Sequence, residues 1–228
     1  MSKVNILHLI EGAKQAEGLT VIIDVFRAFS VEAYAMAGGA KEIWAVGDIE
    51  KAYEMKKEYP HALLAGERGG MKCEGFDCGN SPSEIAKIDL NGKTLIHTTS
   101  AGTQGIANAL HADEIITGSL VNASAIAEYI RKKNPEEVSL VCMGLAGKDQ
   151  TEEDTLCAEY IKALLEGNNP DITAEMNDLA NTSGKKFFDP AKQAAFPQAD
   201  FDMCIQLNRF DFVIRAEAEN GAWRMRRI

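Results

Sequence analysis

The sequence predicts an α/β protein, a three-layer α/β/α sandwich with a mostly parallel sheet and antiparallel edge strands from the carboxyl-terminal region. Short blocks rich in Val and Ile recur along the chain, helical patterns lie between most of them, and an Asn220-Gly221 pair separates two partly alternating runs near the end. Strands that alternate with helices pair in parallel, and helices then cover both faces of the sheet.

The predicted strands cover residues 19–26, 42–47, 62–67, 93–98, 114–119 and 138–144. Helical patterns lie between and after them, over 30–40, 48–59, 103–111, 122–133 and 154–167. Beyond residue 170 the sequence becomes more polar and richer in breakers, with a helix-like stretch over 171–183. Because Asn-Gly is the preferred turn of a two-residue hairpin, we expect the last two strands to extend an edge of the sheet.

Composition limits the class of protein. With 228 residues, 46% hydrophobic and 25% charged, the chain suits a single globular domain over 1–228. A net charge of -10 argues against nucleic-acid partners, which select basic surfaces, and favours a small anionic substrate only if local cations or a metal ion offset the acidic field.

Location and assembly follow from weaker patterns. The first 15 residues lack the apolar region and cleavage site of a signal peptide, and no segment approaches 18 consecutive apolar residues, so we expect no membrane partner and a cytoplasmic protein. Five irregularly spaced cysteines suit reduced thiols. The oligomeric state is not readable, although twofold homodimers are the commonest assembly.

Polar groups follow most of the predicted strands. In open α/β sheets, ligands bind beyond the carboxyl ends of the strands, where loops and helix amino termini meet. We therefore expect the groups in these loops to meet at one edge of the sheet. The loops begin at Asp24, Glu67, Thr98, Gly118 and Gly144.

Asp24 ends an apolar strand, where a carboxylate needs a partner. Arg27, three residues on, could be that partner in a structural ion pair. Alternatively, Asp24 is a metal ligand or phosphoryl acceptor, and Arg27 binds phosphate. The sequence leaves both interpretations open.

The segment TTSAGT supplies hydroxyls at Thr98, Thr99, Ser100 and Thr103, where a strand leads into a helix. Such groups can form an anion-binding cradle, but Ser and Thr are also ordinary helix caps. The order of residues excludes a P-loop. The same two interpretations apply to Ser119 and Asn122.

Three acids open the helix predicted after residue 151. Thr151 and Asp154 fit a capping box. Alternatively, Glu153 or Asp154 turns toward the shared edge and completes the oxygen-rich site that Mg²⁺ prefers.

The remaining cysteines and histidines give weaker signals. Cys73 and Cys78 have no matching pair for zinc, and Cys142 and Cys157 fit a core. His97 fits a packed position inside a strand.

Taken together, these loops resemble the 2-phosphosulfolactate phosphatase family of coenzyme M biosynthesis. The stretches that carry the resemblance are VIIDVFRA (21–28), GERGGMKCEGFDCGNSP (66–82), GKTLIHTTSAGT (92–103), GSLVNASA (118–125), LVCMG (140–144) and EEDTLCA (152–158). The glycine-rich stretch is the most specific. Two departures from the family pattern are Phe29-Ser30, where threonines are usual, and SAGT in place of TNGT.

The resemblance implies a Mg²⁺-dependent phosphatase that hydrolyses the phosphate ester of a 2-hydroxy acid and releases sulfolactate and phosphate. It indicates a set of site residues, to which we give roles by inference. The expected catalytic residues are Asp24, Arg27, Glu67 and Arg68. The expected substrate-binding residues are Asn80, Ser81, Thr98, Thr99, Ser100, Thr103, Ser119 and Asn122. The expected Mg²⁺ ligands are Asp24 with either Glu67 or the pair of Glu153 and Asp154.

Two alternatives stay open. The departures at Phe29 and Ala101 allow a phosphatase for another phosphorylated 2-hydroxy acid. A non-catalytic anion-binding protein of the same fold is less favoured, because a binder of anions gains little from nearby carboxylates.

Overall fold

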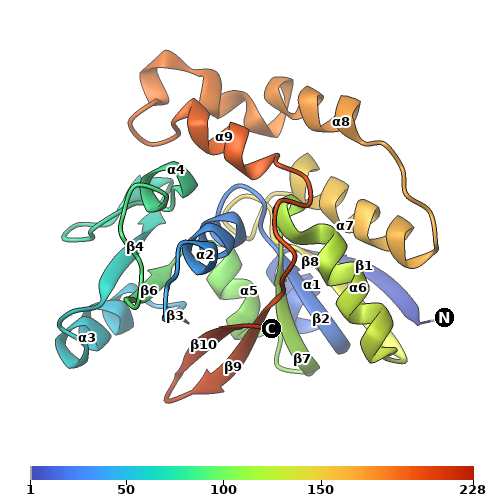
Figure 1. Cartoon of the computed structure of the whole chain (residues 1–228), viewed down its shortest axis with the longest axis horizontal. Helices are drawn as coiled ribbons and strands as arrows, with labels where there is room; N and C mark the ends of the chain where they lie inside the picture. Colours follow the sequence, from blue (N-terminus) through green and yellow to red (C-terminus); the bar gives the residue numbers. More distant parts are fainter. Residues whose placement is uncertain (1) are drawn as a thin grey trace.

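The computed structural model describes residues 2–228, and over this range the strands form one ten-stranded sheet (Figure 1). The order of the strands across the sheet is β1-β8-β2-β7-β9-β10-β3-β6-β4-β5. The strands are β1 (Lys3–His8), β2 (Gly18–Ile23), β3 (Glu42–Ala45), β4 (Leu63–Arg68), β5 (Met71–Lys72), β6 (Thr94–Thr98), β7 (Ala112–Gly118), β8 (Glu137–Cys142), β9 (Ile214–Glu219) and β10 (Ala222–Arg227). The predicted α/β class with a mostly parallel sheet is confirmed.

Helices pack around this sheet. The α-helices are α1 (Leu9–Lys14), α2 (Ala28–Ala37), α3 (Ile49–Glu58), α4 (Pro82–Ile85), α5 (Gly102–Asn108), α6 (Ala123–Lys133), α7 (Glu152–Leu165), α8 (Thr173–Asp178) and α9 (Gln198–Cys204). Short 3-10 helices are η1 (Leu120–Asn122), η2 (Leu179–Asn181), η3 (Ser183–Phe188) and η4 (Pro190–Lys192). None of the helices within residues 2–228 combines the length and apolar character needed to cross a membrane.

The carboxyl-terminal hairpin forms as predicted, but its place in the sheet differs from the prediction. β9 pairs antiparallel with β7 and β10 pairs antiparallel with β3, so the hairpin lies in the middle of the sheet rather than at an edge. Ile214, Ala216 and Met225 are buried in the core on one face. The alternating sequence indicates that one face is buried, but the choice of neighbours depends on contacts with distant strands, which local sequence does not report.

The inserted hairpin reverses the direction of half the sheet. β1, β8, β2 and β7 are parallel to one another, and β3, β6 and β4 form a second parallel set. Three antiparallel pairings, β7 with β9, β9 with β10 and β10 with β3, separate the sets, so the second runs opposite to the first. The sequence predicts that the carboxyl ends of all these strands lie at one edge of the sheet, but the two parallel sets end at opposite edges.

A flat sheet would hold these two carboxyl edges far apart, but α2 and α5 lie between the two sets of strands (Figure 1). Their side chains share one core cluster with Ile22 of β2 and Leu95 of β6. α2 is apolar and buried on nearly every side, as expected for a helix enclosed by other elements. The sheet thus bends around these helices, and the loops after β2 and β4 face one cavity.

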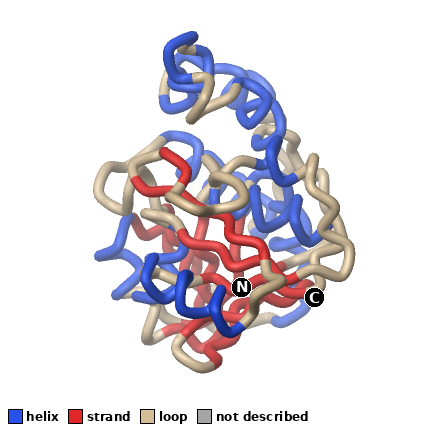
Figure 2. Tube along the Cα trace, turned by 90° about the vertical axis from the view of Figure 1, so that its left-hand side faces the viewer, coloured by secondary structure: helices blue, strands red, loops and turns tan. Residues whose placement is uncertain are grey.

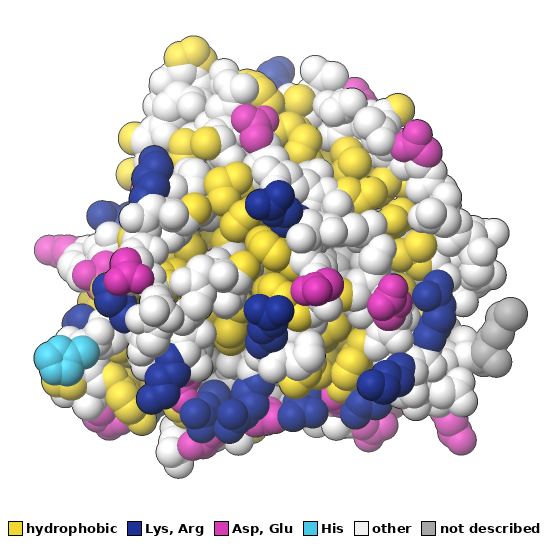
Figure 3. Space-filling model, viewed as in Figure 1, with side chains coloured by type: hydrophobic (Ala, Val, Ile, Leu, Met, Phe, Trp, Pro, Cys, Tyr) yellow, Lys and Arg dark blue, Asp and Glu magenta, His cyan; other side chains and the backbone are white. Residues whose placement is uncertain are grey.

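Both faces of the first parallel set are covered. Side chains of a strand alternate between the faces, and in β2 Ile22 lies in the cluster with α1 and α5, whereas Val21 and Ile23 lie in the cluster with α6 and α7. Over the hairpin the outer face is charged instead. Basic side chains gather at the lower edge of Figure 3, and Arg215, Arg224 and Arg226 form ion pairs with neighbouring glutamates.

Residues 171–205, which we call the cap, contain α8, η2, η3, η4 and α9 and lie across the top of the molecule (Figure 1). Figure 2 shows the same helical segment standing above the strands. Phe187 and Phe201 of the cap are buried, and their ring centroids lie 5.2 and 5.5 Å from that of Phe26, which follows β2. Aromatic packing therefore fixes the cap beside the carboxyl end of β2.

Candidate active site

A cavity of about 310 Å³ lies where the two carboxyl edges meet the cap. Its wall combines loops that are distant in sequence: those after β2, β4, β6 and β8, the residue two before α4, and the cap. The lining residues are Asp24, Phe26, Arg27, Glu67, Gly69, Gly70, Asn80, Ser100, Ala101, Gly144, Leu145, Ala146, Lys186 and Phe196. Five residues expected to act in the site, Asp24, Arg27, Glu67, Asn80 and Ser100, thus lie around one space.

A larger hollow of about 400 Å³ lies between α7 and α8, but its wall contains none of the expected site residues. Its acids include Glu152, Glu159 and Glu175, and no lysine or arginine lines it. A repulsive field of this kind does not suit an anionic ligand. The cavity under the cap is therefore the better candidate site.

Asp24 lies at the amino termini of two helices. Its Oδ1 accepts the Ala28 N–H of α2 at 3.1 Å, and a Cβ atom on Gly102, at the start of α5, would come within 2.9 Å of Oδ2. Glycine at this position therefore allows α5 to approach the carboxylate. Burial raises the pKa of Asp24 to about 6, the Ala28 N–H opposes the rise, and the charges of Glu153 and Glu67 add to it.

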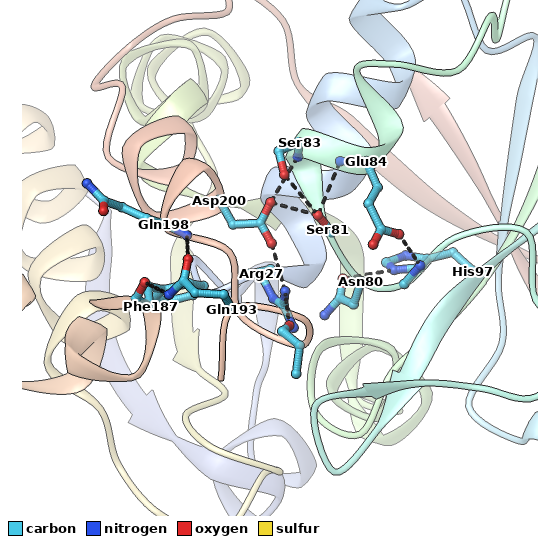
Figure 4. Close-up of polar contacts among 12 residues, drawn as sticks. Arg27, Asn80, Ser81, Ser83, Glu84, His97, Phe187, Gln193, Gln198 and Asp200 are labelled. Carbon is cyan, nitrogen blue, oxygen red and sulfur yellow. Dashed lines mark hydrogen bonds and ion pairs between the residues drawn. The ribbon is translucent and has the colours of Figure 1, made fainter. Parts of the chain in front are cut away.

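Arg27 does not pair with Asp24, so that structural interpretation of the sequence is wrong. Its Nη1 donates to Asp200 Oδ2 at 2.7 Å and to the Ala195 carbonyl at 2.9 Å, both in the cap (Figure 4). The guanidinium carbon lies 4.8 Å from the centroid of the Phe196 ring. Arg27 and Asp200 are both almost fully buried. Asp200, in the cap, thus supplies the negative charge that the buried Arg27 guanidinium requires.

Asp200 is a central residue that sequence reasoning missed. Besides Arg27, its carboxylate accepts the Ser81 hydroxyl at 2.7 Å and the Ser83 N–H at 3.0 Å, at the start of α4 (Figure 4). Ser81, expected to bind substrate, lies outside the cavity wall and also caps α4 by accepting the Glu84 N–H. One buried acid therefore joins the cap, the β2 loop and α4.

Glu67 faces the cavity at the end of β4. Its Oε1 accepts the Ser100 N–H at 2.7 Å, and its Oε2 accepts the Gly70 N–H at 2.6 Å and the Ser100 hydroxyl at 3.2 Å. These bonds hold the carboxylate between the β4–β5 turn and the β6–α5 loop. Gly70 has φ +81°, and a Cβ atom there would lie 2.3 Å from Phe196 Cζ, which explains a glycine at this position.

Arg68 is not among the residues that line the cavity. Its Nη2 donates to Thr98 Oγ1 at 2.8 Å and to the Gly47 carbonyl at 3.2 Å, and its Nη1 donates to the Glu67 carbonyl at 2.7 Å. The guanidinium thus joins the ends of β3, β4 and β6. Thr98, expected in the cradle, is its acceptor rather than a lining residue.

Asn80 faces the cavity as the end of a buried polar chain. His97 Nε2 lies 3.3 Å from Asn80 Oδ1, and His97 Nδ1 lies 3.0 Å from Glu32 Oε1. His97 and Glu32 are fully buried. Figure 4 shows the Asn80 side chain between His97 and Arg27. With its oxygen toward the imidazole, Asn80 turns its amide nitrogen, a hydrogen-bond donor, toward the cavity.

Asp154 takes a structural position at the carboxyl edge of the first parallel set of strands. Its Oδ1 accepts the Val25 N–H and its Oδ2 accepts the Gly144 N–H, both at 2.8 Å, so it joins the ends of β2 and β8. The predicted capping box is wrong, because Thr151 caps α7 without a side-chain hydrogen bond. Burial and the charges of Glu153 and Asp24 raise the pKa of Asp154.

The other expected residues that bind substrate have local partners. Thr99 and Thr103 bond to each other across the start of α5, each N–H donating to the other hydroxyl. Ser119 and Asn122 form a capping box at η1. None of these four residues lines the cavity. The helix-capping interpretation therefore describes Ser119 and Asn122, whereas the N-cap of α5 is Ala101, which forms no side-chain cap.

The acids near the cavity have the donor chemistry for Mg²⁺, although no three His, Cys, Asp or Glu side chains of residues 2–228 form a ready metal site. Asp24 and Glu67 bring carboxylate oxygens to the cavity. Glu153 Oε2 is buried without a hydrogen-bond partner among the described residues. These negative charges raise the pKa of Asp24, and a divalent cation would relieve their repulsion. The residues present fit a Mg²⁺ ion.

Three further lining features had no clear sequence signal. Lys186 and Phe196 come from the breaker-rich cap, and Leu145 comes from the loop after β8. The only sequence property that bears on Lys186 is the general preference of lysine for solvent. This preference wrongly predicts a fully exposed side chain rather than one that lines a cavity. Contacts of the folded chain, not local pattern, bring these residues to the cavity.

A cavity at the carboxyl ends of parallel strands, with buried acids beside a buried arginine, places the chain among α/β enzymes that act on a small polar substrate. The comparisons with known proteins agree. The family described as 2-phosphosulpholactate phosphatase matches residues 4–219, and the chain belongs to this family.

Several curated relatives carry the name "Probable 2-phosphosulfolactate phosphatase". The protein of Bacillus subtilis is 34% identical over 214 residues, which is 92% of each chain. That of Caldicellulosiruptor saccharolyticus is 38% identical, over 86% of this chain and 87% of its own. That of Carboxydothermus hydrogenoformans is 42% identical, over 72% of this chain and 67% of its own.

Proposed function

We propose that this protein hydrolyses 2-phosphosulfolactate to sulfolactate and inorganic phosphate. The observation that carries the proposal is the cavity in which the carboxylates of Asp24 and Glu67 face the same space as Arg27, Asn80 and Ser100. Acids that can hold a cation, set beside donors that can hold an anion, suit a phosphate ester. The names of the relatives support the identity of the substrate.

Mg²⁺ is the proposed cofactor, held by Asp24 and Glu67 with Glu153 as the third acid. When bound, the ion would neutralise charge on the phosphate and orient it. We leave Asp154 out of the ligand set, because it neither lines the cavity, as Asp24 and Glu67 do, nor has an oxygen without a hydrogen-bond partner among the described residues, as Glu153 does.

Arg27 is the proposed phosphate-binding cation. Its Nη1 is bonded to Asp200 and Ala195, and its Nε and Nη2 make no hydrogen bond to another group of residues 2–228. Because Arg27 lines the cavity, these free N–H groups are available to the phosphate oxygens. Asp200 holds the guanidinium plane in place, so the donors are preorganised for the transition state.

Asn80 and Ser100 complete the donors around the phosphate, and Arg68 has a positioning role. By holding the ends of β3, β4 and β6 together, Arg68 keeps Glu67 in place. The predicted direct contact of Arg68 with the substrate has no support from its present hydrogen bonds. His97 positions Asn80 in the same indirect way.

Water is the proposed attacking group. The loop after β2, DVFRA, lacks the D-x-D order of the familiar aspartyl-phosphate phosphatases. Mass spectrometry after incubation with beryllofluoride tests this step, and a stable adduct on Asp24 would contradict it.

Phosphate release from purified protein tests the proposed function. With Mg²⁺, we expect turnover of 2-phosphosulfolactate that chelation by EDTA abolishes. Asp24→Asn and Glu67→Gln should each lower kcat/KM at least about 100-fold, since one preorganised charge contact contributes roughly 2.7 to 4 kcal/mol to the barrier. Asp202→Asn, at an exposed site in α9, is the matched control.

A substrate panel distinguishes the alternatives. Faster turnover of phospholactate or phosphomalate would move the protein to another phosphorylated 2-hydroxy acid. Tight binding of sulfolactate with no phosphate release from any ester would instead show a non-catalytic anion-binding protein.

The cytoplasmic location and the homodimer stay proposals, and the five free cysteines support a reducing compartment.

A further inference from the structure

The cap brings a second cation to the cavity. Lys186, in the 3-10 helix η3, lines the same space as Asp24 and Glu67. Within the described chain, residues 2–228, its ammonium group forms no hydrogen bond or ion pair with an acceptor. Its charge acts on the nearby carboxylate of Glu153 and opposes the rise in the pKa of that acid, but the two groups form no ion pair, so the half-buried ammonium group at the cavity is available to an anionic ligand.

Three aromatic rings hold the ammonium group in place. Lys186 Nζ lies 5.5 Å from the ring centroids of Phe187 and Phe196 and 6.0 Å from that of Phe26. Phe187 is fully buried in the core, and Phe196 packs against the β4–β5 turn at Gly70. Cation–π contacts at these distances favour the charged group over the rings without neutralising it.

The charged residues around the cavity come from different parts of the chain and can bind different groups of the substrate. Arg27 is already paired with Asp200, so its positive charge is partly offset before any ligand binds. The acids proposed to fix the phosphate through Mg²⁺, Asp24 and Glu67, come from the ends of β2 and β4. Lys186 comes from the cap and forms no ion pair with the acids of residues 2–228. 2-Phosphosulfolactate carries two further acidic groups, a carboxylate and a sulfonate, and each needs a cationic partner in a partly desolvated site.

We propose that Lys186 binds a non-phosphate acidic group of the substrate and makes the cap a specificity element of the site. This inference rests on the proposed function for the identity of the ligand. It gives a role to a segment in which the sequence indicated no functional residue. It also explains why an ammonium is held against three rings at the edge of a cavity rather than in solvent.

Equilibrium binding tests the proposal separately from catalysis. By isothermal titration calorimetry with sulfolactate and Mg²⁺, Lys186→Met should weaken binding roughly 10- to 100-fold, the range for losing one charged hydrogen bond. Lys185→Met is the matched control, because Lys185 is the exposed neighbour in the same 3-10 helix, and its affinity should equal that of the wild type. Lys186→Arg, which keeps the charge, should recover part of the loss and checks that the fold is intact.

Titration with lactate, which lacks the sulfonate, identifies the group that Lys186 binds. If the lysine binds the sulfonate, Lys186→Met leaves the weak lactate affinity unchanged, and if it binds the carboxylate, both affinities fall by the same factor. Equal sulfolactate affinity for the wild type, Lys186→Met and Lys185→Met would overturn the proposal. A loss with inorganic phosphate of the same size as with sulfolactate would also overturn it, since Lys186 would then hold the phosphate. Failure of phosphate release with this binding pattern intact would contradict the proposed hydrolysis alone.

Discussion

Replacing Asp200 by Asn tests how the cap is attached over the cavity. The change keeps the size of the side chain and removes its charge. The carboxylate accepts one hydrogen bond from Arg27 at 2.7 Å, one from Ser81 at 2.7 Å and one from the Ser83 N–H at 3.0 Å. An amide placed with its oxygen toward Ser81 and Ser83 would turn its NH2 group toward the guanidinium, donor against donor.

The expected cost follows from burial. The Arg27 side chain is 3% exposed and that of Asp200 is 0% exposed, so water cannot replace the lost charge. Breaking a buried pair by removing one partner costs about 3–5 kcal/mol. For a domain of this size, 1 kcal/mol shifts Tm by about 2–4 °C, so we expect a Tm roughly 6–20 °C below that of the wild type.

Thermal and urea unfolding, followed by circular dichroism, measure this difference. Asp202→Asn, two residues on in α9 and exposed, should stay within about 0.5 kcal/mol of the wild type. The double variant Arg27→Met/Asp200→Asn should lose less stability than the sum of its two single variants, since both disrupt one interaction. An Asp200→Asn protein as stable as Asp202→Asn would refute the account of the cap.

The other predictions concern the glycine turn, a buried polar chain and the cysteines. Gly70→Ala should lower the free energy of unfolding by about 1–3 kcal/mol more than Gly69→Ala, because both positions have positive φ but only Gly70 meets Phe196; equal losses in urea would contradict this. His97→Leu leaves Glu32 without its partner and frees Asn80, so it should destabilise the protein by about 1–3 kcal/mol and raise KM, whereas exposed His111→Leu should do neither. All five cysteines are buried, and burial raises the pKa of Cys78 to about 12. At pH 8 the Cys78 thiol therefore stays protonated, and the cysteines should react with a disulfide reagent only after unfolding. Rapid labelling of Cys78 in the native protein would contradict this prediction.

Sequence patterns predicted the elements well where local signals decide. Strands 19–26 and 138–144 are apolar and β-branched, and the structure contains β2 and β8 there. The Asn220-Gly221 turn was also readable, because positive φ at both residues requires such a pair. The edge strand β1 was missed, since its apolar run is broken by polar residues.

The arrangement of the elements depends on distant contacts. The hairpin could have paired at an edge, and only its burial between β7 and β3 reverses half of the sheet. In the same way Asp154 fitted a cap in sequence, but the Val25 and Gly144 amides draw it to the ends of β2 and β8. Asp154 accepts these buried backbone N–H groups instead of capping the helix, because without it they would have no hydrogen-bond partner.

The site was predictable where a residue ends a strand. Asp24 and Glu67 are polar positions at the carboxyl ends of apolar runs, and both line the cavity. Asp200 and Lys186 lie in a segment without periodicity, so nothing local distinguishes them from solvent-exposed charges. Their burial beside Arg27 and Phe187 exists only in the folded chain.

The most direct test of the central claim is a crystal structure of the protein with Mg²⁺ and sulfolactate. The account predicts sulfolactate in the cavity under the cap, with the cation on Asp24 and Glu67 and an acidic group of the ligand within hydrogen-bonding distance of Lys186. Ligand bound instead in the hollow between α7 and α8, with the cavity under the cap filled only by water, would contradict it.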